Sequence, residues 1–227
     1  MNDKIYTPSK GPDSWKDFLA QPDKHWETGY SAKTMAHCWE DQNGFPKGFN
    51  KILKDSGLDL DILLAIPEYK VYLDNHKAPS QNDLFVLSRD LNGLAVIMIE
   101  GKVSEPFDKL IKDWNNSDSK LCRFEYLADK LEININISES NDLRYQLFHR
   151  TVSSILIAEQ FMAKKAIMIV HSFSQSNEWF NDYLGFVQLI NPNINPKVDE
   201  INKCKTLSSG IDLHIGWIKG DEKYLKK

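Results

Sequence analysis

Two carboxylates and a lysine flank a strong turn signal near the middle of the chain. Asp83 precedes the pair Asn92-Gly93, and Glu100 and Lys102 follow that pair with one residue between them. An Asn-Gly pair between two apolar runs is the strongest short-range sign of a β-hairpin. Carboxylate oxygens suit hard cations such as Mg²⁺, and a nearby lysine can orient a water or stabilise charge that develops on a phosphate. The pattern is therefore typical either of a metal-dependent site that hydrolyses phosphodiesters or of solvated charges at the ends of strands.

The length of the hairpin loop decides how these side chains meet. A two-residue loop at 92–93 places Asp83 opposite Lys102 and one diagonal step from Glu100. A four-residue loop at 90–93 places Asp83 directly opposite Glu100. In both registers the three side chains share one face, because side chains alternate along a strand with a period of two. Opposed Cβ atoms lie ~5 Å apart and diagonal ones ~7–8 Å, so one cation could reach both carboxylates.

Strand-like and helix-like segments alternate along the chain around this hairpin. Apolar runs and alternating patterns predict strands at 69–73, 83–89, 94–102, 166–170 and 211–218. Apolar residues at helical spacing predict helices within 31–54 and at 107–114, 121–131, 143–163 and 178–190. The apolar segment 58–66 fits either a helix or a strand.

The organisation of these segments predicts one α/β domain over 1–227. The continuous apolar run 166–170 is typical of a strand that helices cover on both faces. We expect a core at about 31–175, an N-terminal helical extension at 1–30, and a C-terminal helix and strand within 176–227. No internal repeat or linker divides the sequence.

The composition is close to that of ordinary soluble domains and argues against several classes of protein. The 227 residues contain 28 Lys+Arg against 32 Asp+Glu, a net charge of -4, which weakens the case for broad, non-specific nucleic-acid binding through a basic surface. The three cysteines show no CxxC spacing, which argues against a thiolate zinc site and against a disulfide framework. Phosphate-binding patterns of the GxxxxGK[ST] and GxGxxG types are absent, so a nucleotide-driven motor or a dehydrogenase is not favoured.

The sequence shows no sign of export or of membrane insertion. Residues 1–10 are polar, and the longest apolar run, 94–99, is far shorter than the ~20 residues that a membrane helix needs. We therefore expect a cytoplasmic protein without a membrane partner.

Further polar side chains lie on the predicted helices. Gln146, His149 and Arg150 share one face of the helix predicted at 143–163. They could contact substrate phosphate, with Arg150 as a bidentate donor, or they could form the solvated side of the helix. Glu40, at the end of an earlier helix, could be an additional metal ligand or an exposed helix-end carboxylate.

The order of these residues resembles a known superfamily of nucleases. Asn82-Asp83, a hairpin, Glu100-Gly101-Lys102, and then a helix and a strand are similar to the pattern of the PD-(D/E)XK, or restriction-endonuclease-like, superfamily. The resemblance implies that Asp83 and Glu100 bind Mg²⁺ or Mn²⁺, that the Gly101 carbonyl is a further ligand, and that Lys102 assists the attacking water.

The resemblance also implies a fold and a partner. The superfamily core has the order α-β-β-β-α-β, with a mixed central sheet flanked by helices, and it would cover about 31–175. The resemblance implies nucleic acid as the partner, with DNA expected before RNA, and it is compatible with a homodimer. Some branches carry a Gln and a Tyr on the second core helix, where this chain has Tyr145 and Gln146 in another order. The segments IEGKVSEPF, RYQLFHR and VHSF also resemble an uncharacterised bacterial family of this superfamily.

Two hypotheses follow from the sequence. The first is a Mg²⁺-dependent nuclease that acts on DNA. The alternative, which the acidic composition keeps open, is a catalytically silent member of the same fold that binds nucleic acid or protein. For the metal-free protein we expect Lys102 to neutralise the two carboxylates. Because like charges repel, we also expect Asp83→Asn and Glu100→Gln to leave the fold intact or slightly more stable.

Overall fold

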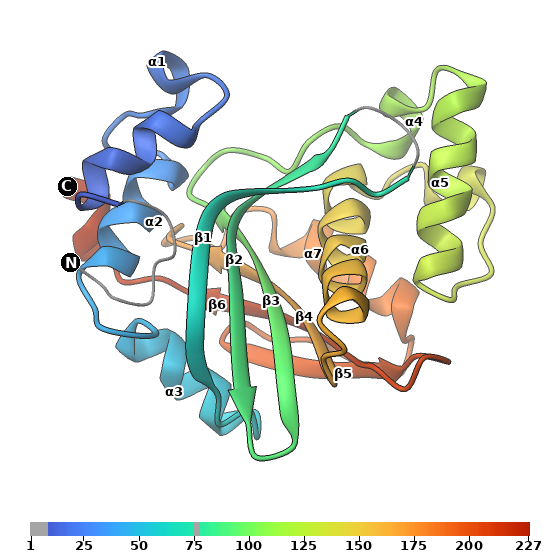
Figure 1. The fold of residues 1–227 in the computed structure, drawn as a ribbon. Helices are drawn as coiled ribbons and strands as arrows, with labels where there is room; N and C mark the ends of the chain where they lie inside the picture. Colours follow the sequence, from blue (N-terminus) through green and yellow to red (C-terminus); the bar gives the residue numbers. More distant parts are fainter. Residues whose placement is uncertain (1–8, 75–77) are drawn as a thin grey trace.

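One sheet of six strands runs through the computed structural model, which describes residues 9–74 and 78–227 (Figure 1). The strands lie in the order β1-β2-β3-β4-β6-β5. β1, β2 and β3 pair antiparallel, β3, β4 and β6 run parallel, and β5 is antiparallel to β6. The strands are β1 (Asp61–Val71), β2 (Ser80–Asp90), β3 (Gly93–Lys102), β4 (Lys165–Ser172), β5 (Glu200–Thr206) and β6 (Asp212–Lys219).

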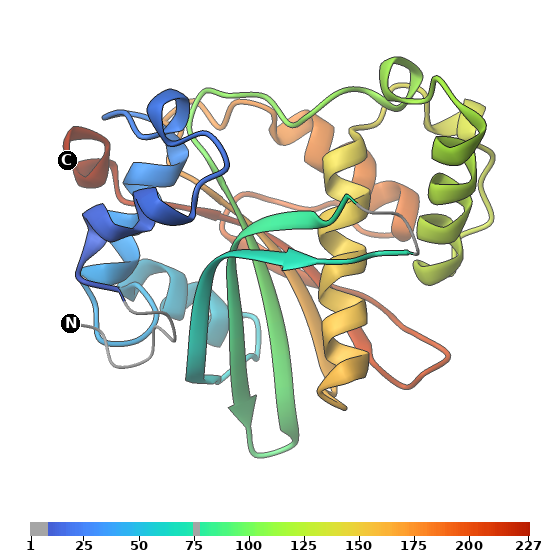
Figure 2. The same cartoon turned by 45° about the horizontal axis from the view of Figure 1, so that its top comes forward.

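Helices cover both faces of this sheet, so the protein is a mixed α/β fold with an open sheet (Figures 1 and 2). One face carries η1 (Pro12–Phe18), α2 (Ser31–Glu40), α3 (Lys47–Asp55) and η3 (Glu222–Lys226), with α1 (Pro22–His25) beside η1 and α2. The other face carries α4 (Ile111–Trp114), α5 (Asp118–Lys130), η2 (Ile137–Ser140), α6 (Tyr145–Gln160) and α7 (Phe180–Ile190).

The central strands are apolar on both faces because helices cover both. Val96 and Met98 of β3 point to the face of α6, whereas Ile97 and Ile99 point to the face of α2 and α3. β4 lies between β3 and β6, which confirms the prediction that 166–170 is an inner strand. α6 packs across β2, β3 and β4, as expected of the long helix that returns the chain to β4.

The β2–β3 hairpin adopts the second of the two predicted registers. Asp90 pairs with Gly93, so Leu91 and Asn92 form the tip, and Gly93 has a positive φ of 134°. The main-chain pairing ends with Leu84 opposite Ile99, and the next pair in this register would be Asp83 with Glu100.

Three elements differ from the prediction. The ambiguous segment 58–66 is mostly strand, because β1 begins at Asp61 and extends the predicted strand toward its N-terminus. Helix α4 is much shorter than the helix predicted at 107–114. β5 was not predicted, since its two buried apolar residues, Ile201 and Cys204, lie three positions apart and a register shift at Lys203/Lys205 breaks the period of two. Residues 1–8 of the predicted N-terminal extension lie outside the described residues.

A buried histidine lies between the sheet and the helices of the α2 face. The Trp39 indole N–H donates to Nδ1 of His171 at 3.3 Å, and the ring of Phe49 packs edge-on against His171 at 5.2 Å. Burial lowers the pKa of His171 to about 3. The ring is therefore neutral in the folded protein at physiological pH.

We predict an acid-sensitive contribution of His171 to stability. The folded-state pKa is lower than the ordinary value of 6.5, so the unfolded chain takes up the proton first and stability is lost as the pH falls below about 6.5. The loss reaches about 2 kcal/mol by pH 5, from the 1.36 kcal/mol that each pKa unit represents. In denaturant unfolding at pH 7 and pH 5, His171→Asn should lack this part of the loss. The exposed His25→Asn should keep the wild-type pH dependence, and equal pH dependence in both variants would contradict the assignment.

Candidate functional site

A cavity of about 500 Å³ opens at the end of the sheet where β2 and β3 stop pairing. It collects most of the side chains that the sequence analysis selected: Asp83, Glu100, Lys102, Gln146 and Arg150. Its outer walls come from residues 19–32, which include α1 and the start of α2, and from the loop at 105–108. The β2–β3 hairpin, the helix α6 and the N-terminal segment thus meet at one place.

The parting of two strands explains the position of Asp83. Beyond Leu84, β2 continues beside β1, while β3 continues beside β4. The main-chain N–H of Gly101 then donates to Oδ2 of Asp83 at 2.7 Å. A side-chain carboxylate therefore accepts the hydrogen bond where the main chain of β2 no longer pairs with β3.

Glu100 is the most highly coordinated side chain of the cavity. Its Oε1 accepts hydrogen bonds from Nζ of Lys102 and Nε2 of Gln146, both at 2.8 Å, and its Oε2 accepts one from Nε of Arg150 at 2.5 Å. Only 4% of the side chain is exposed. Burial opposes ionisation, but the charges of Arg150 and Lys102 outweigh it and hold the pKa of Glu100 below its ordinary value.

The pKa of Asp83 is shifted in the opposite direction. Burial raises its pKa well above the ordinary value, and the nearby carboxylates of Glu100 and Glu68 raise it further. Arg150 and Lys102 oppose this shift without cancelling it. Two neighbouring carboxylates whose pKa values move in opposite directions are typical of functional sites, although structural ion pairs also produce such shifts.

Glu68 is a third carboxylate of the cavity, and the sequence analysis did not select it. Pro67 pairs with Leu84 and Tyr69 with Asn82, so Glu68 lies opposite Asp83 in the same row across the sheet. Its main chain is in the left-handed region, with φ of 53°, which is uncommon for a residue other than glycine. Burial raises the pKa of Glu68 to about 7, and Gln81 donates to its Oε2 at 2.6 Å.

A carboxylate directly after a proline, at the end of the apolar run 62–67, is the signal in the sequence that could have identified Glu68. It was not used because the strand was predicted to begin at Tyr69. Once the register is known, Glu68, Asp83 and Glu100 follow one another on β1, β2 and β3.

The polar face predicted on α6 points into the protein. Arg150 lines the cavity but uses its guanidinium internally, with Nη1 donating to Oγ of Ser80 at 3.0 Å as well as Nε to Glu100. His149 is buried, its Nδ1 lies 2.8 Å from Oγ of Ser80, and its ring packs on Tyr145. Burial and the charge of Arg150 lower the pKa of His149 well below 6.5. His149 does not line the cavity, so the structure does not bring it together with the other predicted site residues. Its burial contradicts the alternative of a solvated face.

Glu40 and Gly101 have structural roles in the described protein. The Glu40 carboxylate accepts hydrogen bonds from the Ser9 hydroxyl and, at 2.8 Å, from the Trp15 indole, and it does not line the cavity. The structure therefore does not bring Glu40 together with the other predicted site residues. At Gly101 a Cβ atom would come within 2.3 Å of Sδ of Met35 on α2, so glycine allows the helix to approach the strand closely.

The donor set of the cavity limits which cation could bind. Among the described residues, no group of three or more His, Cys, Asp or Glu side chains is arranged to hold a metal ion. This finding disfavours a site built wholly from protein side chains. Mg²⁺, by contrast, keeps several waters and is commonly bound through one or two carboxylates. Asp83 and Glu100 satisfy that smaller requirement by their chemistry and by sharing the cavity.

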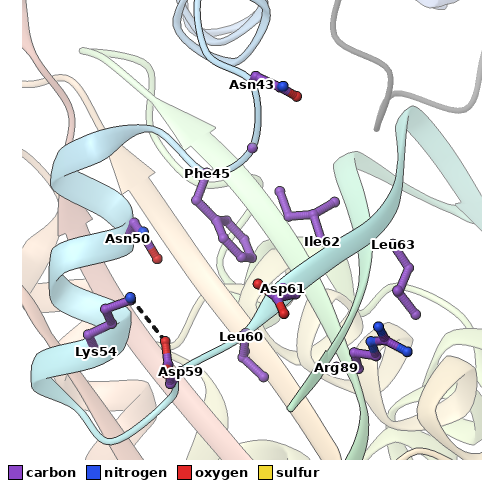
Figure 3. Close-up of a pocket in the computed structure, with 11 residues that line it drawn as sticks. Asn43, Phe45, Asn50, Lys54, Asp59, Leu60, Asp61, Ile62, Leu63 and Arg89 are labelled. Carbon is purple, nitrogen blue, oxygen red and sulfur yellow. Dashed lines mark ion pairs between the residues drawn. The ribbon is translucent and has the colours of Figure 1, made fainter.

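A second cavity of about 370 Å³ lies at the other end of β1, between α3 and the first residues of the strand (Figure 3). Lys54 and Asp59 form an ion pair across it at 3.1 Å, and Arg89 of β2 pairs with Asp61 in the strand register. None of the residues predicted to carry chemistry lines this cavity. We therefore take the cavity at Asp83 and Glu100 as the candidate functional site.

Fold and site together define an α/β protein with a six-stranded mixed sheet and a carboxylate-lined cavity at one sheet end. The chain belongs to the family described as a domain of unknown function (DUF6946), whose model matches residues 8–222. No curated protein and no solved structure gave a match to the chain. Within the described residues, no helix is long and apolar enough to cross a membrane.

The structure changes one expectation about stability and gives a testable contrast. Asp83→Asn should leave the melting temperature unchanged or raise it, because it removes a disfavoured charge while the amide oxygen can still accept from Gly101. Glu100→Gln should instead destabilise strongly, since it leaves Arg150 and Lys102 buried without their counter-charge. Breaking a buried pair in this way costs about 3–5 kcal/mol, or a melting temperature lower by on the order of 10 °C. Equal melting temperatures for the two variants would contradict this description of the site.

Proposed function

We propose that this protein is a metal-dependent nuclease of the restriction-endonuclease-like type, which hydrolyses phosphodiester bonds in DNA. The observation that carries the proposal is that Asp83, Glu100 and Lys102 line one cavity at the point where the two hairpin strands part. Residues predicted from the sequence to act together are thus brought together by the fold.

The order of the elements supports the same proposal. The elements α2, β1, β2, β3, α6 and β4 follow one another in the order α-β-β-β-α-β along the chain. The helix α3 lies between α2 and β1, and α4, α5 and η2 lie between β3 and α6. β4 returns parallel to β3 after α6. The cavity lies beside the last residues of β3, where the E-G-K segment ends the strand.

Asp83 and Glu100, with the main-chain carbonyl of Gly101, are the groups that would hold a divalent cation. Their surroundings fit a cation, because three carboxylates meet only two buried cations there and the pKa values of Asp83 and Glu68 are raised. When bound, Mg²⁺ or Mn²⁺ would lower the pKa of a coordinated water and neutralise charge on the phosphate.

Lys102 is the group that would act on the reacting atoms. In the metal-free protein its ammonium is paired with Glu100 and lies 5.1 Å from the centre of the Phe107 ring. A lysine in this position can donate a hydrogen bond to the attacking water or to the oxygen on which charge develops. Gln146 and Arg150 act as positioning residues, because both donate to the carboxylate of Glu100.

One observation favours the second hypothesis, a silent member that only binds a partner. Both oxygens of Glu100 already accept hydrogen bonds, and its charge is compensated by Lys102 and Arg150. Such a site is neutralised internally, so a cation must compete with Lys102 for Oε1. The measurement of metal binding separates the two hypotheses.

The test is calorimetric titration with Mn²⁺ combined with a cleavage assay on DNA in Mg²⁺ or Mn²⁺. We expect the wild type to bind Mn²⁺ and to cleave, and Asp83→Asn to lose both by about 100-fold or more, because a neutral amide is a much poorer ligand than a carboxylate. Asp108→Asn, which removes an exposed carboxylate from the same cavity, is the matched control and should retain both activities.

Lys102→Met separates the roles of the site residues. It should still bind Mn²⁺, since it removes a competitor for Glu100, yet it should lose cleavage. A wild type that binds no Mn²⁺, or that binds it as tightly as Asp83→Asn does, would refute the nuclease proposal and favour the binding module.

A further inference from the structure

We infer that the cavity accepts the free end of a single nucleic-acid strand and engages only one or two of its phosphates, rather than the interior of a duplex. This inference rests on the proposed function and adds the form of the substrate to it. Three features of the cavity support it: the small number of cations, the contact between the two outer walls, and the volume.

The cavity contains few basic side chains, and two of them already form ion pairs with a carboxylate of the protein. Of the described residues that line it, the basic ones are Lys24, His25, Lys102 and Arg150. Lys102 and Arg150 are buried and paired with Glu100. Lys24 and His25, both on α1, are exposed and thus remain to contact phosphate.

A duplex would require many more cations than the exposed Lys24 provides. Double-stranded DNA carries one negative charge per ~1.7 Å of its axis, and duplex-binding proteins commonly neutralise about 6–10 phosphates. The mouth of the cavity also carries the carboxylates of Glu105 and Asp108, and the net charge of the chain is -4. A long phosphate backbone lying across this surface would meet repulsion, whereas a short segment that enters beside α1 would not.

The two outer walls are joined to each other. The main-chain N–H of Ser31, in the first turn of α2, donates to Oε1 of Glu105 at 3.1 Å, and the N–H of Val103 donates to Oε2 at 3.1 Å. The carboxylate of Glu105 therefore ties the loop after β3 to the N-terminal segment, and Figure 2 shows these two segments side by side above the end of the sheet. A nucleic-acid strand cannot pass between the two walls at this contact. We therefore expect its end to lie inside the cavity.

The size and one aromatic side chain of the cavity suit a terminal nucleotide. A volume of about 500 Å³ falls within the range of about 300–1,000 Å³ that holds small-molecule ligands. Tyr30, which is 44% exposed, belongs to the cavity lining and offers a flat surface on which a base can stack. Base stacking of this kind tolerates any sequence and favours unpaired strands, because a paired base has its faces covered.

Binding is tested by fluorescence anisotropy of the full chain in EDTA, where no cleavage occurs, with a labelled linear single strand, a closed circular strand and a duplex of equal length. We expect the linear strand to bind at least ten times more tightly than the circle or the duplex. The slope of log affinity against log salt should lie between about -0.7 and -1.4, since each phosphate on a single strand contributes about -0.7. Lys24→Ala should reduce the magnitude of this slope by about 0.7.

Tyr30→Ala tests the stacking surface. It should weaken binding of the linear strand about 10-fold, whereas Tyr72→Ala, which alters an exposed tyrosine outside the cavity lining, should leave it unchanged. A linear RNA of the same length, measured in parallel, distinguishes DNA from RNA as the source of the strand end.

The failure of this inference can be distinguished from failure of the nuclease proposal. If Mn²⁺-dependent cleavage is present but circle and duplex are cut as fast as the linear strand, the inference is wrong and the nuclease proposal stands. If the linear strand binds preferentially but no metal binds, the ligand is as inferred and the nuclease proposal is wrong. A salt slope of about -4 or steeper with tight duplex binding would overturn the inference directly.

Discussion

The candidate site depends on the compensation of one buried carboxylate. Glu100 lies near the end of β3, a strand whose residues are buried from Ala95 onward, and an unpaired charge there would cost on the order of several kcal/mol or more. Lys102 from the same strand and Gln146 and Arg150 from α6 supply the donors that keep it ionised. These contacts tie the helix to the end of the sheet, and Arg150 in turn contacts Ser80 at the start of β2. The contacts that neutralise Glu100 therefore fix the relative positions of α6 and the strand ends that form the cavity.

The second consequence is a separation of charge states within one row of carboxylates. Glu100 takes both cations as partners, so Asp83 and Glu68 share the same buried surroundings with less compensation, and their pKa values rise. Both groups would ionise more readily if a further positive charge entered the cavity. A divalent cation held by Asp83 and Glu100 would therefore favour the ionised forms of Asp83 and Glu68, and Lys102 would then be free to act on the reacting atoms.

Periodicity and turn chemistry were enough to predict the hairpin, the inner strand β4 and the long helix α6, because each carries a strong local signal. They were also enough to select Asp83, Glu100 and Lys102, whose shared cavity follows from the register of one hairpin. Glu68 and the burial of His149 depend on pairing and packing between segments far apart in the chain, which local patterns do not record. The expected stability of Glu100→Gln changes for the same reason, since like-charge repulsion alone takes no account of the partner Arg150.

The most direct measurement is anomalous diffraction from crystals grown or soaked in Mn²⁺. The proposed mechanism predicts one strong peak in the cavity, about 2.1 Å from carboxylate oxygens of both Asp83 and Glu100, with the Lys102 amine moved away from Oε1 of Glu100. The mechanism would be contradicted if the cavity showed no peak at a Mn²⁺ concentration that produces peaks at other sites of the crystal. It would also be contradicted by a peak that contacts neither carboxylate and leaves the Glu100–Lys102 pair intact.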